Sequence, residues 1–86
     1  MKPYTEHIKS ESVSVRTFSV NIPEEELQWH WDEQDRIVTP MCPTDWLFQF
    51  DNELPFVINI PIFIPAGVIH RVIKGSQDLV VKIEKL

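Results

Sequence analysis

Apolar and polar residues alternate along most of this chain with a period of two, which is the pattern of β-strands. The alternating or apolar segments predict strands over residues 12–22, 27–32, 36–41, 46–51, 56–58, 62–64, 68–74 and 79–83. Proline, aspartate and asparagine mark several of the junctions between them. Short strands at this spacing, with almost no helical segment, predict an all-β sandwich or barrel formed as a single domain by residues 1–86.

Local features predict how these strands are interrupted and connected. The alternation slips by one position at residues 16–17, which predicts a β-bulge. Pro23 followed by three glutamates predicts at most one helical turn in a solvated acidic corner. Residues 75–78 (Gly-Ser-Gln-Asp) predict a hairpin turn between the last two strands. Residues 1–11 are expected to form a flexible N-terminal segment, with His7 facing solvent.

The fourth predicted strand shows which side of a strand faces the interior. Trp46, Phe48 and Phe50 share one face, and Gln49 and Asp51 share the other. Since the polar pair should face water, the three aromatic rings are expected to point inward, where they either pack in the core or line a ligand pocket. In the last strand, the residues that share the apolar face are Leu79, Val81 and Ile83.

The segment Trp29-His30-Trp31-Asp32 allows two orientations. His30 and Asp32 fall on one face, and Trp29 and Trp31 fall on the other. If the tryptophans face the core, His30 and Asp32 are surface residues. If His30 and Asp32 face a cavity, the tryptophans lie outside and need cover, most simply from a second subunit. Alternation alone leaves both orientations open, and the second predicts a homodimer.

The small size of the domain limits how it can be stabilised. A chain of 86 residues has a thin margin of stability, which small proteins usually supplement with disulfides, a metal or a partner subunit. The single cysteine, Cys42, excludes an intramolecular disulfide and fits a reducing cytoplasm. Cys42 is expected to be a buried small hydrophobe rather than a nucleophile. Metal binding and oligomerisation therefore remain as sources of stability.

Charge and motifs argue against several classes of function. The net charge is −5 and the basic residues form no run, which argues against nucleic-acid binding. No apolar stretch reaches about 18 residues, so no membrane span is expected. The first residues lack the apolar core of a secretion signal, so a cytoplasmic protein is expected. The chain has no Gly-x-Ser-x-Gly, phosphate-binding glycine loop or Cys-x-x-Cys, which excludes those chemistries.

Residues 64–72, Ile-Pro-Ala-Gly-Val-Ile-His-Arg-Val, resemble the second conserved motif of the cupin superfamily. In that motif a proline, a glycine two residues later and a histidine three residues further lie between two strands. Pro65 would end one strand, Gly67 would allow a tight turn, and His70 would begin the next strand pointing inward. The resemblance implies a small jelly-roll or cupin-type double-stranded β-barrel.

An earlier segment resembles the first cupin motif, in which two histidines separated by one residue are followed by a glutamate. His30 matches the first histidine, Asp32 stands in place of the second, and Arg36 stands in place of the glutamate. Two glycines of the family pattern are also replaced, by Pro43 and Asn59. The second motif therefore matches the family better than the first.

The resemblance implies that His30, Asp32 and His70 meet inside the barrel as metal ligands. Two imidazoles and one carboxylate form the facial triad that holds Fe(II), and the same donors suit Zn, Mn or Ni. Arg36 argues against a metal, because its permanent positive charge repels a divalent cation. Arg36 could instead pair with Asp32 or Asp35, or bind a carboxylate or phosphate of a ligand. The residues expected to line the pocket or orient substrate are Arg36, Trp46, Phe48 and Phe50.

Three functions fit these residues. The first is a metal-dependent oxygenase or isomerase that acts on a small metabolite. The second is metal-free acid–base catalysis by a His–Asp pair, as in the sugar-nucleotide epimerases of the same superfamily. The third is a non-catalytic module that binds a small ligand or docks to a partner. In that third case aromatic rings would fill the interior and leave no space beside His70.

Overall fold

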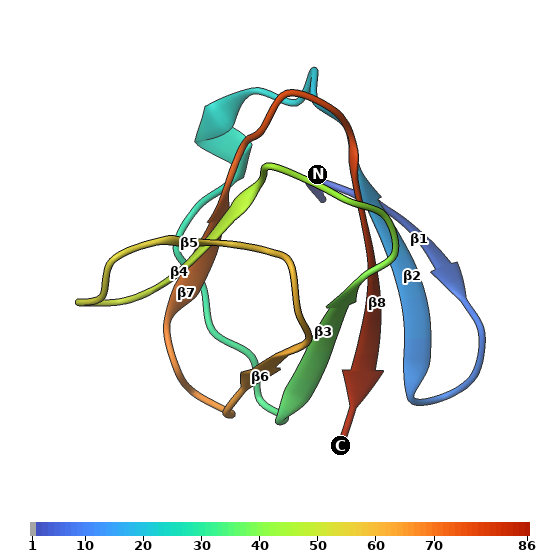
Figure 1. The fold of residues 1–86 in the computed structure, drawn as a ribbon. Coiled ribbons are helices and arrows are strands. Elements are labelled where there is room, and N and C mark those ends of the chain that lie inside the picture. The colour runs from blue at the N-terminus through green and yellow to red at the C-terminus, as the bar shows by residue number, and fades with distance from the viewer. Residues whose placement is uncertain (1) are drawn as a thin grey trace.

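Eight strands and one short 3-10 helix form within residues 2–86, the part of the chain that the computed structural model describes (Figure 1). The strands are β1 (Thr5–Ile8), β2 (Val13–Phe18), β3 (Arg36–Pro40), β4 (Leu47–Phe50), β5 (Phe56–Val57), β6 (Ile62–Ile64), β7 (His70–Ile73) and β8 (Leu79–Lys85). The helix, η1 (Glu24–Glu26), is the single exposed turn that the sequence predicts. In the described residues no helix is long and apolar enough to cross a membrane.

The strands form two antiparallel sheets, which confirms the all-β prediction. One sheet has five strands in the order β1-β2-β8-β3-β6, and the other has three in the order β5-β4-β7. Figure 1 shows the smaller sheet on one side of the interior and the larger sheet on the other. No strand in residues 2–86 belongs to both sheets, so the predicted barrel consists of two sheets that enclose a common core.

The core lies between the sheets and combines the inner faces of both. Trp46 is completely buried and Phe48 is 2% exposed, while Phe50 packs against them. The inward orientation predicted for these three rings is therefore confirmed. The remaining core residues are Val38, Ile58, Ile62, Ile64, Leu79, Val81 and Ile83. The last three confirm the face predicted for β8.

Strand β2 is regular, and the bulge predicted at residues 16–17 is wrong. The pairing of β2 with β8 runs without interruption from Val13, opposite Glu84, to Phe18, opposite Leu79. Arg16 lies opposite the buried Val81, so its side chain leaves the sheet on the inner face. The hydrophobic pattern slips because a charged residue occupies an inward position, not because the backbone gains a residue.

Residues 75–78 cross from one sheet to the other, and the predicted hairpin is wrong. Strand β7 pairs with β4, whereas β8 pairs with β2 and β3. The Trp46 indole N–H donates to the carbonyl of Gln77, and Asp45 Oδ1 accepts the Ser76 N–H at 2.8 Å. These contacts fold the loop around Trp46, which directs the chain away from β7 and into the larger sheet.

Three further expectations differ from the structure. Residues 27–32 form no continuous strand, since their one β-bridge is at His30, which pairs with His70. Residues 5–8 form strand β1, so this part of the expected flexible segment is ordered along β2. Because β1 covers that side, β2 is an internal strand of the larger sheet. Cys42 is exposed rather than buried.

Replacement of Gly75 by alanine should destabilise the fold strongly. A β-carbon at position 75 would lie 2.2 Å from Asp45 Oδ1 and 2.8 Å from the Trp46 backbone nitrogen. Since the Trp46 backbone cannot move without disturbing the core, G75A should lower the free energy of unfolding by about 2–3 kcal/mol. Gly67 has open space around it but a φ of +78°, so G67A should cost only about 1 kcal/mol. Urea unfolding measures the free energy of unfolding of both variants. A loss of stability for G75A that is equal to or smaller than that for G67A would contradict this account.

The exposed ring of Trp31 keeps the homodimer as a prediction. Trp31 is 57% exposed, whereas Trp29, although 42% exposed, lines the same pocket as His30 and Asp32. We expect light scattering at micromolar concentration to give twice the chain mass of 10.1 kDa. The W31S variant should shift the equilibrium toward single chains, because it removes an exposed apolar ring. A single-chain mass for the unmodified protein would refute the dimer.

Candidate metal centre

The backbone brings the two histidine segments together. Pro65 directly follows β6, and Gly67 then turns the chain with a positive φ of 78°. The Gly67 N–H donates to the Asp32 carbonyl at 2.8 Å. His30 and His70 exchange backbone hydrogen bonds of 3.0 and 2.8 Å. This three-bond contact fixes the first-motif segment against the start of β7, as the resemblance implies.

The same contact places three donor side chains in one cluster. Ligand atoms of His30, Asp32 and His70 all lie within 4.8 Å of one another. The imidazole rings of the two histidines are 4.2 Å apart between centroids and are inclined at 65°. His70 is 3% exposed, Asp32 is half-buried and His30 is exposed. The three residues selected from the sequence therefore converge, with His70 at the back of the cluster and His30 at its open side.

Backbone carbonyls fix the orientation of both imidazoles. The Nδ1 atom of His70 lies 2.8 Å from the Val68 carbonyl oxygen, and that of His30 lies 3.2 Å from the Gln28 carbonyl oxygen. A carbonyl oxygen can only accept, so Nδ1 carries the hydrogen in each ring. In a neutral ring this leaves the lone pair on Nε2 as the available donor. Metal-binding histidines commonly have this arrangement.

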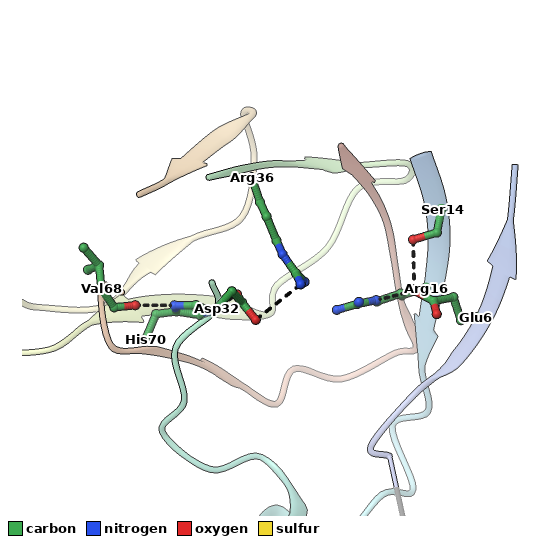
Figure 2. Close-up of polar contacts among 7 residues, drawn as sticks. All are labelled: Glu6, Ser14, Arg16, Asp32, Arg36, Val68 and His70. Atoms are coloured by element: carbon green, nitrogen blue, oxygen red, sulfur yellow. Dashed lines mark hydrogen bonds and ion pairs between the residues drawn. The ribbon is translucent and has the colours of Figure 1, made fainter. Parts of the chain in front are cut away.

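Asp32 lies between His70 and Arg36 (Figure 2). Its Oδ2 atom is 3.4 Å from His70 Nε2, and its Oδ1 atom is 3.5 Å from Arg36 Nη2. Arg36 therefore contacts one carboxylate oxygen and leaves the other free to act as a ligand. A bidentate contact, which would neutralise both oxygens, is not formed.

The approach of Asp32 Oδ2 to His70 Nε2 favours a cation at this point. Both atoms present lone pairs when His70 is neutral, so their approach is unfavourable unless a proton or a cation lies between them. In tetrahedral zinc sites with bonds of about 2.0–2.1 Å, two ligand atoms are separated by about 3.3 Å. The observed 3.4 Å is close to this separation.

A pocket with a volume of about 430 Å³ adjoins the cluster. His30, Asp32 and Arg36 line it, and residues of β2 form part of its wall. Of the four residues expected to line the pocket, Arg36 does so, whereas Trp46 and Phe48 are core residues and Phe50 packs against the core. The Phe48 ring stacks on the His70 ring, with 5.4 Å between the ring centroids. Phe48 therefore supports the back of the imidazole and does not face the pocket.

Sequence reasoning missed Arg16 as a pocket residue. Arg16 lines the same pocket as Arg36, and its side chain is only 14% exposed. Its Nε atom donates to Glu6 Oε2 at 2.8 Å, which lowers the pKa of the Glu6 carboxyl and keeps it ionised. The signal was present in the chain as the slip in alternation at residues 16–17. A charged residue at an inward position of a strand could have been interpreted as part of a site.

Comparison with known proteins shows the fold but no close relative. No protein-family model matches the chain, and no curated protein matches it. A cupin domain from Bordetella pertussis is 24% identical, with a TM-score of 0.63 over 100% of this chain and 97% of that one. An RmlC-like cupin family protein with a double-stranded β-helix fold from Methanocaldococcus jannaschii is 12% identical, with a TM-score of 0.64 over 99% of this chain and 81% of that one.

An enzyme is also among the similar structures. The DMSP lyase DddQ from Ruegeria pomeroyi is 12% identical, with a TM-score of 0.77 over 96% of this chain. The chain spans 46% of the length of that lyase. These likenesses show that the protein has the cupin fold. It is a small cupin-type domain in which a buried and an exposed histidine meet where the two sequence motifs come together.

The buried imidazole should make the metal-free protein sensitive to acid. Burial lowers the pKa of His70 below its usual value of 6.5, because desolvation disfavours the imidazolium. The hydrogen bond to the Val68 carbonyl acts in the opposite direction without reversing the shift. Above about pH 6.5 His70 adds no pH dependence to the free energy of unfolding. Below that pH the unfolded chain binds a proton at this residue more readily than the folded protein does. The free energy of unfolding should therefore fall as the pH is lowered from about 7 to 5.

The H70Q variant should show a smaller decrease over this pH interval, since it lacks the titrating ring. The H7Q variant is the matched control, because His7 is exposed on β1, and it should keep the slope of the unmodified protein. Urea unfolding of chelator-treated protein at several pH values measures this difference. An identical slope for H70Q and the unmodified protein would contradict the assignment.

Proposed function

We propose that the protein is a metal-dependent enzyme that acts on a small molecule, with His30, Asp32 and His70 as the metal ligands. The observation that carries this proposal is the convergence of the three donors, with both Nδ1 atoms already occupied by backbone carbonyls. Ligand orientation of this kind is fixed before a metal arrives, which reduces the entropic cost of binding. The isomerase and oxygenase reactions named from the sequence are the classes this site would serve.

The donor set fits a divalent transition metal. Two imidazole nitrogens and one carboxylate oxygen suit Fe, Zn, Mn or Ni, and three protein ligands leave coordination positions for substrate. Arg36 is compatible with such a metal because it lies beside Oδ1 of Asp32, whereas Oδ2 faces His70. Its charge would still weaken metal binding, since no anionic group of the site compensates for it fully.

The residues of the chain have separable roles in this proposal. A bound divalent metal would polarise a carbonyl or carboxyl oxygen of the substrate as a Lewis acid, and iron would in addition allow oxygen chemistry. Arg36 would hold Asp32 in position, and Phe48 would hold the His70 ring from behind. The half-enclosed pocket beside His30 would bind the substrate and exclude part of its hydration shell.

A metal-free function is the second candidate, and the 3.5 Å contact between Arg36 and Asp32 favours it. In that case Arg36 would stabilise the ionised Asp32, which would act with His70 as an acid–base pair, or the pocket would only bind a ligand. The aromatic rings do not fill the space beside the cluster, since a pocket of about 430 Å³ remains there. The pocket therefore favours ligand binding over a purely structural role.

Metal content tests the two candidates directly. Elemental analysis of untagged protein, purified without chelator, should give close to one equivalent of a transition metal. The H30Q and H70Q variants should each bind the metal at least about tenfold more weakly, because one of three ligands is lost. H7Q should bind it normally, since the third histidine lies outside the cluster.

Metal identity then separates the reaction classes, because zinc supports isomerase-type chemistry and iron supports oxygenase chemistry. Less than a tenth of an equivalent, with no uptake on soaking, would end the metal proposal and favour the metal-free candidate. Loss of metal from H7Q as from the other variants would show that the histidine cluster is not the site.

A further inference from the structure

We propose that Arg16 and Arg36 together bind an oxyanion group, a carboxylate or a phosphate, of the molecule that occupies the pocket. Arg16 comes from β2 and Arg36 from β3, on opposite sides of the central strand β8. Both line the pocket that His30 and Asp32 also line. Figure 2 shows the two guanidinium groups extending toward one another from their strands, with Asp32 beside Arg36.

Arg16 is held rigidly in this position. Its Nε atom contacts Glu6 Oε2 at 2.8 Å, and the Ser14 hydroxyl donates to the same oxygen at 3.0 Å. Its guanidinium carbon lies 4.2 Å from the centroid of the Tyr4 ring. Arg16 contacts Glu6 through its Nε atom, so the terminal nitrogens of Arg16 are directed toward the pocket. A guanidinium fixed in this way loses little conformational entropy when it binds an anion.

Arg36 has unused hydrogen-bonding capacity. Within residues 2–86 its buried Nε atom has no hydrogen-bond partner. Its contact with Asp32 is 3.5 Å long, which is longer than a strong charge-assisted hydrogen bond. An unpartnered buried N–H is unfavourable, and a bound oxyanion would satisfy it. Asp32 alone therefore does not account for the position of Arg36.

Two guanidinium groups that line one pocket select for an anion. Like charges repel, and an oxyanion between them removes this repulsion and can accept bidentate hydrogen bonds from each. The carboxylates near the pocket do not fill this role. Glu6 engages Nε of Arg16, Asp32 lies beside the metal ligands, and Glu26 is exposed in the pocket wall.

The remaining residues of the pocket indicate the chemistry of the part of the ligand that lies away from the arginines. Its apolar wall is formed by Tyr4, Phe18, Leu27, Trp29 and Val72. A volume of about 430 Å³ suits a small organic molecule. The ligand class is therefore a small organic acid or phosphate ester. The anionic group of the ligand would contact the arginines, and the rest of the molecule would extend toward His30 and Asp32. This orientation toward the metal ligands rests on the proposed function.

Anion binding can be tested without metal or turnover. Succinate and inorganic phosphate are titrated separately into chelator-treated protein and into zinc-loaded protein at constant ionic strength. The readout is the NMR signal of the Trp29 indole N–H, since Trp29 lines the pocket. Saturable shifts with succinate indicate a carboxylate ligand, and saturable shifts with phosphate indicate a phosphate ester. Either result supports the proposal.

Arginine variants give the decisive comparison. R16Q and R36Q should each raise the dissociation constant of the bound probe about tenfold or more, because each removes charge-assisted hydrogen bonds. K9Q is the matched control, since Lys9 is exposed and its loss changes the net charge equally, and its dissociation constant should stay within twofold of the unmodified protein. R16K and R36K keep the charge but lose the planar donor pair, so they should also bind more weakly. Thermal unfolding establishes that each variant is folded.

The outcome is independent of the metal proposal. No saturable shift with either probe, with or without zinc, would overturn the arginine site. Equal dissociation constants for R16Q, R36Q and K9Q would also overturn it. Metal uptake is measured on the same samples, and R16Q should bind zinc as the unmodified protein does, because Arg16 pairs with Glu6 and contacts none of the three metal ligands. A protein that binds the anion but no metal would thus retain this inference and lose the proposed metal chemistry.

Discussion

The contact between the His30 segment and the start of β7 is the constraint on which the candidate site depends. Two backbone hydrogen bonds join His30 to His70, and a third joins Gly67 to Asp32. Residues 40 positions apart in the chain acquire a fixed separation through these bonds, and each histidine is then oriented by the carbonyl two residues before it. The donor cluster is therefore a property of the backbone more than of side-chain packing. These hydrogen bonds orient the donors independently of any bound metal.

Charge in the interior is distributed along one line of side chains. Glu6, Arg16 and Arg36 belong to strands of the larger sheet, and Asp32 joins Arg36 to His70 at the start of β7 in the smaller sheet. The arginines each contact one carboxylate, and neither contact uses the full guanidinium. A pocket built in this way is close to neutral when empty and gains favourable interactions from both a cation and an anion. A metal at the histidines and an acid at the arginines would therefore compensate one another.

Much of the fold and the core of the site could be predicted from the sequence, for identifiable reasons. Strand alternation located the inward rings of β4 and the apolar face of β8, since burial there follows the period of two. The proline–glycine–histidine spacing located the turn at Gly67. Prediction failed where tertiary contacts decide the structure, as in the crossover around Trp46 and the ordered strand β1. Arg16 was missed because an inward charge was interpreted as a backbone irregularity.

The position of β1 has a practical consequence for handling the protein. Pro3 and Tyr4 form part of the pocket wall, so the start of the chain runs along the entrance to the candidate site. Any sequence fused ahead of these residues, such as a polyhistidine purification tag, would lie close to the pocket and could supply foreign imidazoles to a metal there. Fusion after Leu86, which follows the end of β8 and does not line the pocket, would leave Pro3 and Tyr4 without an added sequence ahead of them.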